Sequence, residues 1–540
     1  MKVLVIGGYG VFGERLARLL IRDGHQVTIA GRDLAKAQDL AAKLGCSAQH
    51  MDREGDPAGL IGHEVMVDAA GPFHTDGDDP WRLARAAIAA GVHYLDLSDN
   101  AAFCSGLAAL DRDARAAGLC VISGLSTVPA LSSAAVRALS GDLSPRVIDI
   151  AVLPGNRSPR GFSVMTTILS QAGRPMPVWR GGEWTGATGW SDPARYRLPG
   201  GLARQGWLIA VPDLRLFPAH FGAETVLFRA GLELAVMRYG LAAFAALRRV
   251  WPVPVTRPVV QAFKFAADLL SPFGSGRGGM SVMVIVGQDR RWWRLLAEDG
   301  DGPFIPAVAV RALLRRKSLP AGARPAVAVI TLEEAEAAMS DLRVRFERAD
   351  EPFAPIFARV LGQSFASLPG PIRATHLTAD RSRWHGRATV TRGKGIWSRF
   401  LGWLFRFPVA SDNVPVAVTK TVTARGEAWQ RRFGGRTFQS QLAARQGGIT
   451  ESFGPFTFLL ALAVRDGALH YAVASGHLGP IPLPRWLLPV SWSREYVHDG
   501  TFHFDVKLLA PLTGGLVVHY RGSLAAAKDG DPGRIPDFPA

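Results

Sequence analysis

The first thirty residues restrict the fold of this chain more than any other stretch. Residues 2–6 form a short apolar run rich in β-branched side chains, which is typical of a buried strand. Three glycines follow with the spacing G-x-G-x-x-G, namely Gly8, Gly10 and Gly13. The amphipathic residues 14–23 then predict a helix, and residues 26–30 predict a second strand. The opening therefore predicts a strand, a glycine turn, a helix and a strand in succession.

Each glycine of this pattern has a physical role in binding a dinucleotide. The first lets the strand turn sharply, the second lets a pyrophosphate approach the backbone, and the third lets the helix pack closely on the strand. Free N–H groups and the positive end of the helix dipole then face the phosphates. We expect cofactor contacts from the whole loop, that is from Gly8, Tyr9, Gly10, Val11, Phe12 and Gly13. The alternative is a tight turn in an α/β sheet that holds no nucleotide.

The residues after the second strand select the nucleotide. An acidic side chain at this place binds the ribose 2′-hydroxyl of NAD, whereas a guanidinium group suits the 2′-phosphate of NADP. The chain has Arg32 here, followed by Asp33. Arg32 favours NADP as the cofactor, and Asp33 keeps NAD as the less favoured alternative.

Composition narrows the class of protein. A chain of 540 residues is too long for one ordinary core, so we expect more than one domain. A hydrophobic content of 48% and a charged content of 20% are typical of a globular chain. The three cysteines lie far apart, which excludes a disulfide framework and a cysteine metal site and favours the cytoplasm. The N-terminal apolar run is too short to be a signal peptide.

The net charge of +16 bears on possible partners. Basic proteins bind nucleic acid, anionic lipid or acidic metabolites, or simply carry a solvated basic surface. No nucleic-acid-binding motif accompanies the charge, so we expect no nucleic-acid partner. A small-molecule substrate remains the main expectation.

Later segments extend the nucleotide-binding domain. Residues 64–70 predict a buried strand, and the turn after such a strand passes over the nucleotide, so Ala70 and Gly71 are candidate cofactor contacts. Residues 94–97 predict another strand in the segment GVHYLDLSD. We expect this segment to lie near the nicotinamide end of the cofactor.

Hydride transfer to a carbonyl or imine also needs a proton donor. His93 and Asp96, at the edges of that strand, are the predicted catalytic residues, and a histidine there titrates near neutral pH. His74, Tyr94 and Ser98 are further candidates. The alternative is that His93 and Tyr94 are packing residues and that Asp96 caps the next helix. The sequence contains no zinc signature, and we predict no metal site.

Taken together, these segments resemble the saccharopine dehydrogenase-like reductases. The matching pieces are IGGYGVFG, the AGR strand end, VDAAGPF, GVHYLDLSD and GLSTVPALSS, in the family's order over residues 1–135. The resemblance implies a Rossmann domain, an NAD(P) cofactor and a second domain, inserted after it, that holds the substrate. It does not name the substrate, because many relatives are broadly defined oxidoreductases.

The expected fold is therefore α/β with an additional β-rich part. We predict a Rossmann domain at residues 1–135 and an inserted α+β substrate or dimerisation domain at 136–330, whose last helix returns to the Rossmann domain. A linker at 331–360 and a mostly β domain at 361–540 follow.

Two apolar segments allow a second interpretation. Residues 217–274 contain apolar runs interrupted by arginines, and residues 395–407 (GIWSRFLGWLFRF) form an aromatic amphipathic stretch. Neither offers 18 clean apolar residues, so a spanning helix is not expected. Packing within the core or in a homodimer is the simpler interpretation, and peripheral contact with a membrane is the alternative.

The last third resembles a bacterial domain family of unknown function that is often fused to saccharopine dehydrogenase-like modules. The matching pieces are GEAWQRRFGGRTFQS, the ESFG segment, IPLPRWLLP and PLTGGLVVHYRG. Regular hairpin spacing predicts a curved sheet or a small barrel. Two groups of polar residues are candidate pocket linings: Trp429, Arg431, Arg432, Arg436 and Glu451, and His477, Arg485 and Arg494.

Two functions are consistent with these patterns. The first is an NADP-dependent oxidoreductase acting on a hydrophobic or anionic small molecule. The second is a non-catalytic nucleotide-binding module that serves as sensor or scaffold for a ligand-binding C-terminal domain. A proton donor beside the nicotinamide distinguishes the first from the second.

Overall fold

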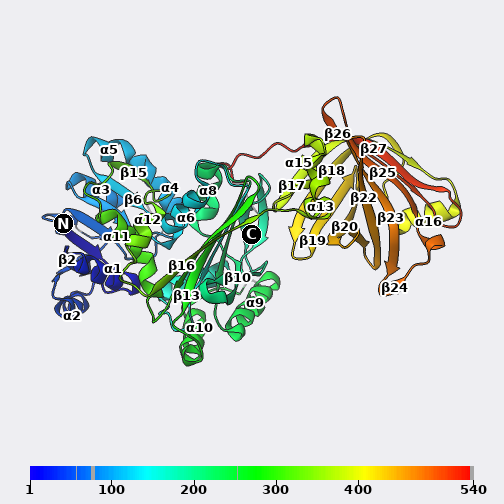
Figure 1. Cartoon of the computed structure of the whole chain (residues 1–540). Helices are drawn as coiled ribbons and strands as arrows, with labels where there is room; N and C mark the ends of the chain where they lie inside the picture. Colours follow the sequence, from blue (N-terminus) through cyan, green and yellow to red (C-terminus); the bar gives the residue numbers. More distant parts are fainter. Residues whose placement is uncertain (56, 74–78, 252, 536–540) are drawn as a thin grey trace. The chain divides into compact units, whose positions relative to one another are not determined.

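The computed structural model describes residues 1–55, 57–73, 79–251 and 253–535. The chain divides into two compact units. The first holds residues 1–179 and 183–351 with the segment that begins at residue 531, and the second holds residues 180–182 and 352–530. Figure 1 labels many of the helices and strands of both units. The first unit contains two seven-stranded sheets and a two-stranded one, and the second contains an eleven-stranded sheet.

The first sheet consists of parallel strands in the order β15-β6-β5-β4-β1-β2-β3. Its strands are β1 Lys2–Ile6, β2 Gln26–Gly31, β3 Ser47–His50, β4 Val65–Asp68, β5 His93–Asp96, β6 Cys120–Ser123 and β15 Gly322–Pro325. β1 pairs with β2 on one side and with β4 on the other. The carboxyl ends of β1 and β4 therefore border the crevice in which open α/β sheets bind ligands.

Helices connect these strands. They are α1 Val11–Arg22, α2 Leu34–Leu44, η1 Pro57–Leu60, α3 Arg82–Ala89, α4 Ala101–Gly106, η2 Leu107–Leu110, α5 Asp111–Ala116, η3 Thr127–Leu131 and α6 Ser132–Ser140. The amphipathic pattern explains α1, because Leu16, Leu19 and Leu20 are completely buried on the face that packs against the sheet.

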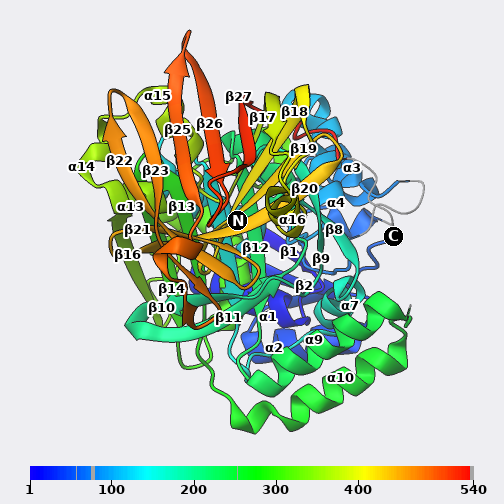
Figure 2. The ribbon, with the colours of Figure 1, turned by 90° about the vertical axis from the view of Figure 1, so that its right-hand side faces the viewer.

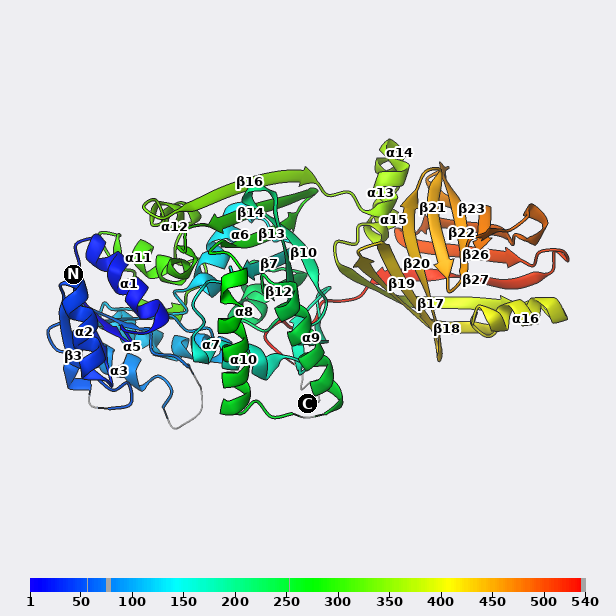
Figure 3. The same ribbon diagram turned by 90° about the horizontal axis from the view of Figure 1, so that it is seen from below.

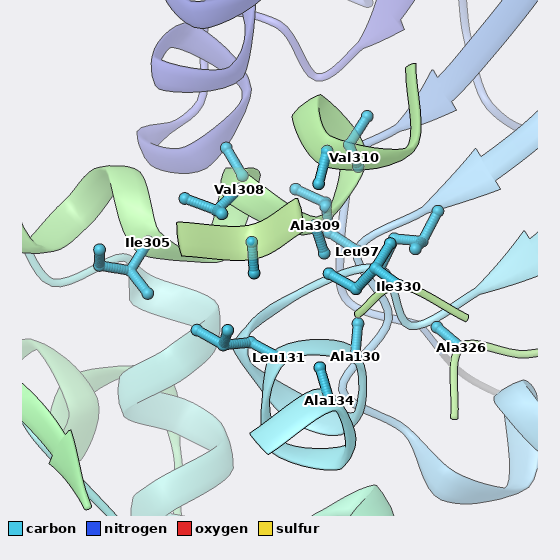
Figure 4. Close-up of a cluster of buried hydrophobic side chains, with 14 of the residues drawn as sticks. Leu97, Ala130, Leu131, Ala134, Ile305, Val308, Ala309, Val310, Ala326 and Ile330 are labelled. Carbon is cyan, nitrogen blue, oxygen red and sulfur yellow. The ribbon is translucent and has the colours of Figure 1, made fainter. Parts of the chain in front are cut away.

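The part of the first unit that contains the first sheet is completed by residues from much later in the chain. η6 Gly302–Ala307 and α11 Val308–Leu314 pack on α1, and β15 pairs with β6 as the seventh strand of the first sheet. Figure 4 shows the resulting core, in which Leu97, Leu131, Val308 and Ile330 come from four separate stretches of sequence. The first sheet is therefore built from two discontinuous parts of the chain.

The second sheet is mixed, with strand order β10-β11-β12-β7-β13-β14-β16. Its strands are β7 Val147–Leu153, β10 Ala194–Leu198, β11 Leu202–Leu208, β12 Thr225–Gly231, β13 Gly278–Val286, β14 Asp289–Ala297 and β16 Val344–Pro352, and β8 Pro175–Trp179 pairs separately with β9 Trp184–Thr188. Its helices are α7 Phe162–Gln171, α8 Pro212–Phe221, α9 Ala235–Val250 and α10 Arg257–Leu269, with η4 Pro199–Gly201 and η5 Ser271–Phe273.

The apolar segment at 217–274 contains a strand as well as helices. β12 is a buried member of the sheet, parallel to β7, because its residues include the β-branched and aromatic side chains that strands favour. α9 and α10 lie beside each other (Figure 2), with the rings of Phe244 and Phe263 5.0 Å apart. Within the described ranges, no helix is both long enough and apolar enough to span a bilayer.

The stretch expected to be a linker, residues 331–360, is structured. It contains α12 Leu332–Ala337, which begins with a capping box formed by Thr331 and Glu334, and the strand β16. β16 joins the second sheet because the ring of Phe346 stacks on Trp293, a side chain that is completely buried. The sequence predicted a solvated connector here because β16 carries many charged residues, and most of these are exposed.

The second unit is a closed antiparallel barrel. Ten strands follow each other around it: β17 Arg381–Arg392, β18 Ser411–Thr423, β19 Gly426–Phe433, β20 Arg436–Arg445, β21 Gly448–Phe453, β22 Phe456–Arg465, β23 Ala468–Leu478, β25 Val490–His498, β26 Thr501–Leu509 and β27 Leu516–Ala526. β17 pairs with β27 and β22 with β23, which closes the ring. β24 Ile481–Pro482 is a short addition to β23.

Short helices cover the two ends of this barrel (Figures 1 and 3). α13 Ile356–Leu361, α14 Gln363–Ala366 and α15 Gly370–His376 lie at the end where β17 begins, and α16 Ile396–Leu404 and η7 Arg485–Leu487 lie at the other. The predicted fold class is confirmed, since a Rossmann-like parallel sheet at the N-terminus is combined with a mostly β C-terminal domain.

Candidate functional site

The glycine loop begins with a left-handed residue. Gly7 has a φ of 71°, and its N–H and that of Gly8 donate to the carbonyl of Ala30 at 2.8 and 3.2 Å. A Cβ on Gly8 would lie 2.9 Å from both the Val5 carbonyl oxygen and the Ile29 side chain. Gly7 therefore makes the sharp turn that the sequence pattern assigns to Gly8, and Gly8 is restricted by close packing instead.

The other two glycines of the pattern position α1. Gly10 precedes the helix as its N-cap, and no side chain caps the helix there. A Cβ on Gly13 would lie 2.2 Å from the Gly7 carbonyl oxygen, so only glycine allows α1 to approach β1 this closely. The amides of Val11 and Phe12, in the first turn, have no partner within the helix. These amides and the helix dipole form a binding place for a phosphate group.

The end of β2 separates the roles of Arg32 and Asp33. The Asp33 carboxylate accepts from the Lys36 amide at 3.1 Å and pairs with the Lys36 ammonium at 3.0 Å, so it caps α2. The side-chain hydrogen bond and the charge of Lys36 lower the pKa of Asp33. Tyr9 packs on Gly31, and its hydroxyl accepts from the Asp33 amide at 3.2 Å. Arg32 is exposed, and its side chain forms no ion pair within the part of the chain that the structure describes.

Residues after β4 meet the glycine loop. A Cβ on Gly7 would lie 2.8 Å from the Ala70 Cα, and the Ala70 amide donates to Asp68 at 2.9 Å. Gly71 follows Ala70 at the surface. The structure therefore brings the predicted contacts from the β1 loop and from the β4 loop to one crevice.

An ion pair that the sequence pattern did not reveal supports the β4 loop. Asp68 is completely buried, and its carboxylate accepts from Arg53 at 2.7 Å. Arg53 also donates to the Pro72 carbonyl at 3.1 Å and lies 4.7 Å from the centre of the Phe73 ring. Burial raises the pKa of Asp68, and Arg53 offsets part of this effect. A carboxylate at the end of the otherwise apolar run VMVD was the available signal.

Asp96 lies at the carboxyl end of β5, directly opposite Asp68 in the parallel pairing. It has no exposed surface, and one carboxylate oxygen, Oδ1, accepts from the Ser98 amide, the Ser123 hydroxyl and the Gly124 amide at 2.8–2.9 Å. The other oxygen, Oδ2, has no hydrogen-bond partner among the described residues. Burial raises the pKa of Asp96 to about 7, although these three hydrogen bonds act against the rise.

His93 lies at the opposite edge of the sheet. It is the first residue of β5, and Asp96 is the last, which separates the two by roughly 10 Å along the strand. Its ring accepts from the Cys120 amide at 2.9 Å, and burial lowers its pKa. The carboxyl ends of the strands hold the glycine loop, so the structure does not bring His93 to the same crevice as the other predicted site residues.

The remaining candidates near Asp96 have different positions. Tyr94 is buried, and burial and the charge of Asp96 raise its pKa well above the usual value. Asn100, rather than Asp96, caps the next helix by accepting from two amides of α4. His74 lies outside the described residues. Among the candidates that the structure describes, Asp96 alone combines burial, a raised acid pKa and an unused oxygen.

Some of the polar residues predicted to line a pocket in the second unit face the interior of the barrel, and others face outward, because side chains alternate along the strands. Trp429, Arg431 and Glu451 line the interior of the barrel, together with Arg494 at its edge. Arg432, Arg436 and His477 are exposed. Arg431 donates to Glu451 at 3.0 Å and to Ser440 at 2.8 Å, so its charge is compensated inside the barrel.

Within the described ranges, no group of three or more His, Cys, Asp or Glu side chains is arranged to hold a metal ion.

Two family models match this chain, one within the first unit and one within the second. Residues 3–122 match a family model described as the saccharopine dehydrogenase NADP binding domain. Residues 368–524 match a model described as a domain of unknown function, DUF4166. Both resemblances expected from the sequence are thereby confirmed. The search of curated proteins found no match to this chain.

Solved structures with similar parts were also found. Saccharopine dehydrogenase from Saccharomyces cerevisiae is 14% identical, with a TM-score of 0.42 over 64% of this chain and 99% of that one. The TT0495 protein from Thermus thermophilus is 28% identical over 18% of this chain and 54% of that one, with a TM-score of 0.15. Gre2 from Candida albicans, solved with NADPH, is 20% identical over 19% and 38%, with a TM-score of 0.17.

Proposed function

We propose that the first unit of this chain is an NADP-dependent oxidoreductase, with the dinucleotide lying across the crevice between β1 and β4. The observation that carries the proposal is the combination of the glycine loop with a free Arg32 beside an engaged Asp33. The match of residues 3–122 to an NADP-binding family supports it. When bound, the nicotinamide supplies or accepts a hydride.

The residues around the crevice fit each part of such a cofactor. Gly8, Gly10 and Gly13 leave the backbone of the loop without a Cβ at these positions, so a pyrophosphate could approach it at the start of α1. Arg32 follows β2 and would hold the 2′-phosphate with its planar donor groups. With the adenosine end held there, the nicotinamide end would lie toward the carboxyl ends of β4 and β5, near Ala70, Gly71 and Asp96.

Arg32→Ala should reduce the affinity for NADPH by roughly 10- to 100-fold, because the 2′-phosphate loses a charge-assisted pair of hydrogen bonds. Its affinity for NADH should stay unchanged, since NADH has no phosphate at that position. Titration of both nucleotides by tryptophan fluorescence measures this difference. Equal NADPH affinity in wild type and variant would assign the cofactor selectivity to another residue.

Asp96 is the proposed proton donor. Its Oδ1 atom is fixed by three hydrogen bonds, and Oδ2 remains free to hold a proton. A carboxyl group with a pKa near neutral is suited to give a proton to a carbonyl or imine and to take it back. Asp68, opposite it, is compensated by Arg53 and is therefore not proposed for this role.

Asp96→Asn should change the pH dependence of stability. Because the folded-state pKa is raised above the ordinary value, the unfolded chain loses this proton near pH 4 while the folded protein keeps it up to about pH 7. Wild-type stability therefore falls between these two values, by roughly 4 kcal/mol from this group. Asparagine keeps the Oδ1 hydrogen bonds and removes the titration, so the variant should lack this fall. Urea unfolding of the first unit at several pH values measures it, and identical profiles would contradict the raised pKa.

The oxidoreductase itself is tested by a screen of carbonyl and imine compounds for NADPH oxidation by the full chain. With an active substrate, Asp96→Asn should lower kcat by about 100-fold or more and leave the KM for NADPH nearly unchanged. Tight NADPH binding without oxidation by any compound would favour the non-catalytic nucleotide-binding module. Equal kcat in wild type and variant would assign proton transfer to a group other than Asp96.

A further inference from the structure

The closed barrel of the second unit encloses a cavity of about 470 Å³, here called the barrel cavity. Strand alternation explains its lining: on β18, Val416 and Val418 point inward, and Phe433 and Phe438 do so from β19 and β20. Most other lining side chains are also Phe, Leu, Val, Trp or Tyr. A cavity of this size and character suits a small, largely apolar molecule.

The apolar lining continues to one end of the barrel. Trp397, Phe400 and Leu401 of α16 line the cavity there, together with Leu483 and Leu487 from the segment between β23 and β25. Large apolar side chains around this end are exposed, including Ile396, Trp403, Ile481, Trp486 and Trp492. No acidic residue occurs in 393–410 or in 475–492. The residues of α16 and of this segment therefore place no carboxylate at this end of the cavity.

The opposite end of the barrel cavity is polar, and its lysine and its glutamate each have a partner within the protein. Lys420 is 3% exposed, donates to the Thr375 carbonyl at 2.6 Å, and its ammonium lies 3.8 Å from the centre of the Trp429 ring. Glu495 shares a hydrogen bond of 2.6 Å with His376. Burial lowers the pKa of Lys420 to about 8, so the lysine is mostly charged at neutral pH, and burial also lowers the pKa of His376.

Each positive side chain that lines the barrel cavity has an acidic side chain nearby, so no ligand is needed to compensate its charge. Lys420 is offset by the nearby Glu495, and Arg431 is offset by Glu451. Arg494 is half exposed at the edge and has Asp505 as its partner at 3.7 Å.

One further acidic group lies beneath the lining. Glu427 is 1% exposed, one of its oxygens accepts from Trp429 at 2.8 Å, and burial raises its pKa. Ionisation of Glu427 therefore adds a negative charge beside the cavity, which Lys420 and the exposed Arg359 offset only in part. An added carboxylate would stand in an apolar space with no unused positive partner, which is strongly unfavourable.

We propose that the barrel cavity is a binding site for a neutral, single-chain lipid such as a long-chain alcohol or aldehyde, with its polar end beside Lys420, Tyr471 and Ser493. The neutral oxygen accepts a hydrogen bond from the ammonium or a hydroxyl, and the chain fills the aromatic part of the cavity. Of the two ligand classes expected from the sequence, hydrophobic and anionic, the charge balance selects the hydrophobic one. The site does not depend on whether the first unit is an oxidoreductase.

The test uses the full chain and the neutral fluorescent probe N-phenyl-1-naphthylamine. Dodecanol and dodecanal should displace the probe at concentrations about tenfold or more below those needed with dodecanoate at neutral pH. Val473→Trp fills the cavity and should weaken probe binding by about tenfold or more, whereas Ala472→Trp, one residue along β23 and facing outward, should leave it unchanged.

Three results would overturn the proposal: dodecanoate competing as well as dodecanol, Val473→Trp binding the probe like wild type, or Ala472→Trp losing binding to the same degree. Should Val473→Trp lack the thermal transition of the second unit, Ser493→Leu provides a smaller filling substitution on β25. It should weaken probe binding as well, and unchanged binding in that variant equally contradicts the proposal.

Discussion

Gly13→Val is expected to abolish NADPH binding, with an affinity loss beyond about 100-fold, and to destabilise the first unit by about 3 kcal/mol or more. The reason is steric: a Cβ at this position would lie 2.2 Å from the Gly7 carbonyl oxygen and 2.9 Å from the Gly8 Cα. These are backbone atoms, so no side chain can rotate away. α1 must move off β1, and the amides of its first turn then no longer converge on the phosphates.

The matched control for this substitution is Gly240→Ala. Gly240 also lies in a helix, α9, but no atom lies within 4 Å of the position that its Cβ would take. Alanine there should leave NADPH affinity unchanged and stabilise the protein by about 0.5–1 kcal/mol, the difference in helix propensity. NADPH titration and thermal unfolding measure both variants. NADPH binding by Gly13→Val at wild-type affinity would place the nucleotide elsewhere.

Arg311→Met is expected to destabilise the first unit by about 3–5 kcal/mol, the usual cost of removing one partner from a buried ion pair. Arg311 of α11 is 2% exposed, donates to both oxygens of Asp23 at 2.8 and 2.9 Å, and also pairs with Asp341. Methionine keeps much of the volume but leaves two carboxylates with fewer donors. Asp23 follows α1, so the substitution weakens the link between the returning helix and the nucleotide-binding helix.

The loss of stability caused by Arg311→Met should become smaller as the pH falls. Burial alone would raise the pKa of Asp23, but the hydrogen bonds and charges of Arg315 and Arg311 outweigh burial and hold that pKa well below its ordinary value. The stabilisation is therefore complete above about pH 4, the unfolded value, and is lost as the pH falls further. The difference between wild type and variant should be largest at neutral pH and shrink under acid conditions.

The control is Arg112→Met, which removes the exposed pair of Arg112 with Asp113 and should cost less than about 0.5 kcal/mol. Denaturant unfolding followed by hydrogen exchange in α1 and α11 resolves the first unit from the second. Equal stability losses for the two variants would show that the buried network contributes no more than a surface pair.

The nucleotide-binding half could be predicted well because its signals are local. The spacing of Gly8, Gly10 and Gly13 and the position of Arg32 follow directly from the turn and the strand that they border. Gly7 escaped prediction because the motif does not include it, although its positive φ makes the turn. The Asp33 carboxylate could not be assigned from sequence, since capping a helix and binding a ribose both place an acidic residue after a strand.

The catalytic candidates show where local pattern fails. His93 and Asp96 bracket the same four-residue strand, yet parallel pairing places one at the amino edge and the other at the carboxyl edge of the sheet. Arg53 reaches Asp68 from a separate stretch of chain, and such contacts depend on the tertiary fold. The position of Lys420 inside the barrel could not be predicted from the sequence. It lies in a strand with alternating side chains, and this alternation alone does not show which face of the strand lines a cavity.

The strand pairing that closes the barrel affects how easily the chain aggregates during its synthesis. β17 is complete early in the synthesis of the second unit, but one of its two partners is β27, with Trp384 paired to Ala526. Until β27 has been synthesised, β17 and β26 each keep an open edge that can pair with another chain. Pairing between strands so distant in sequence is slow to form. The nascent barrel is therefore most vulnerable to aggregation just before its last strand appears, and chains truncated within β27 should be recovered mainly as insoluble protein.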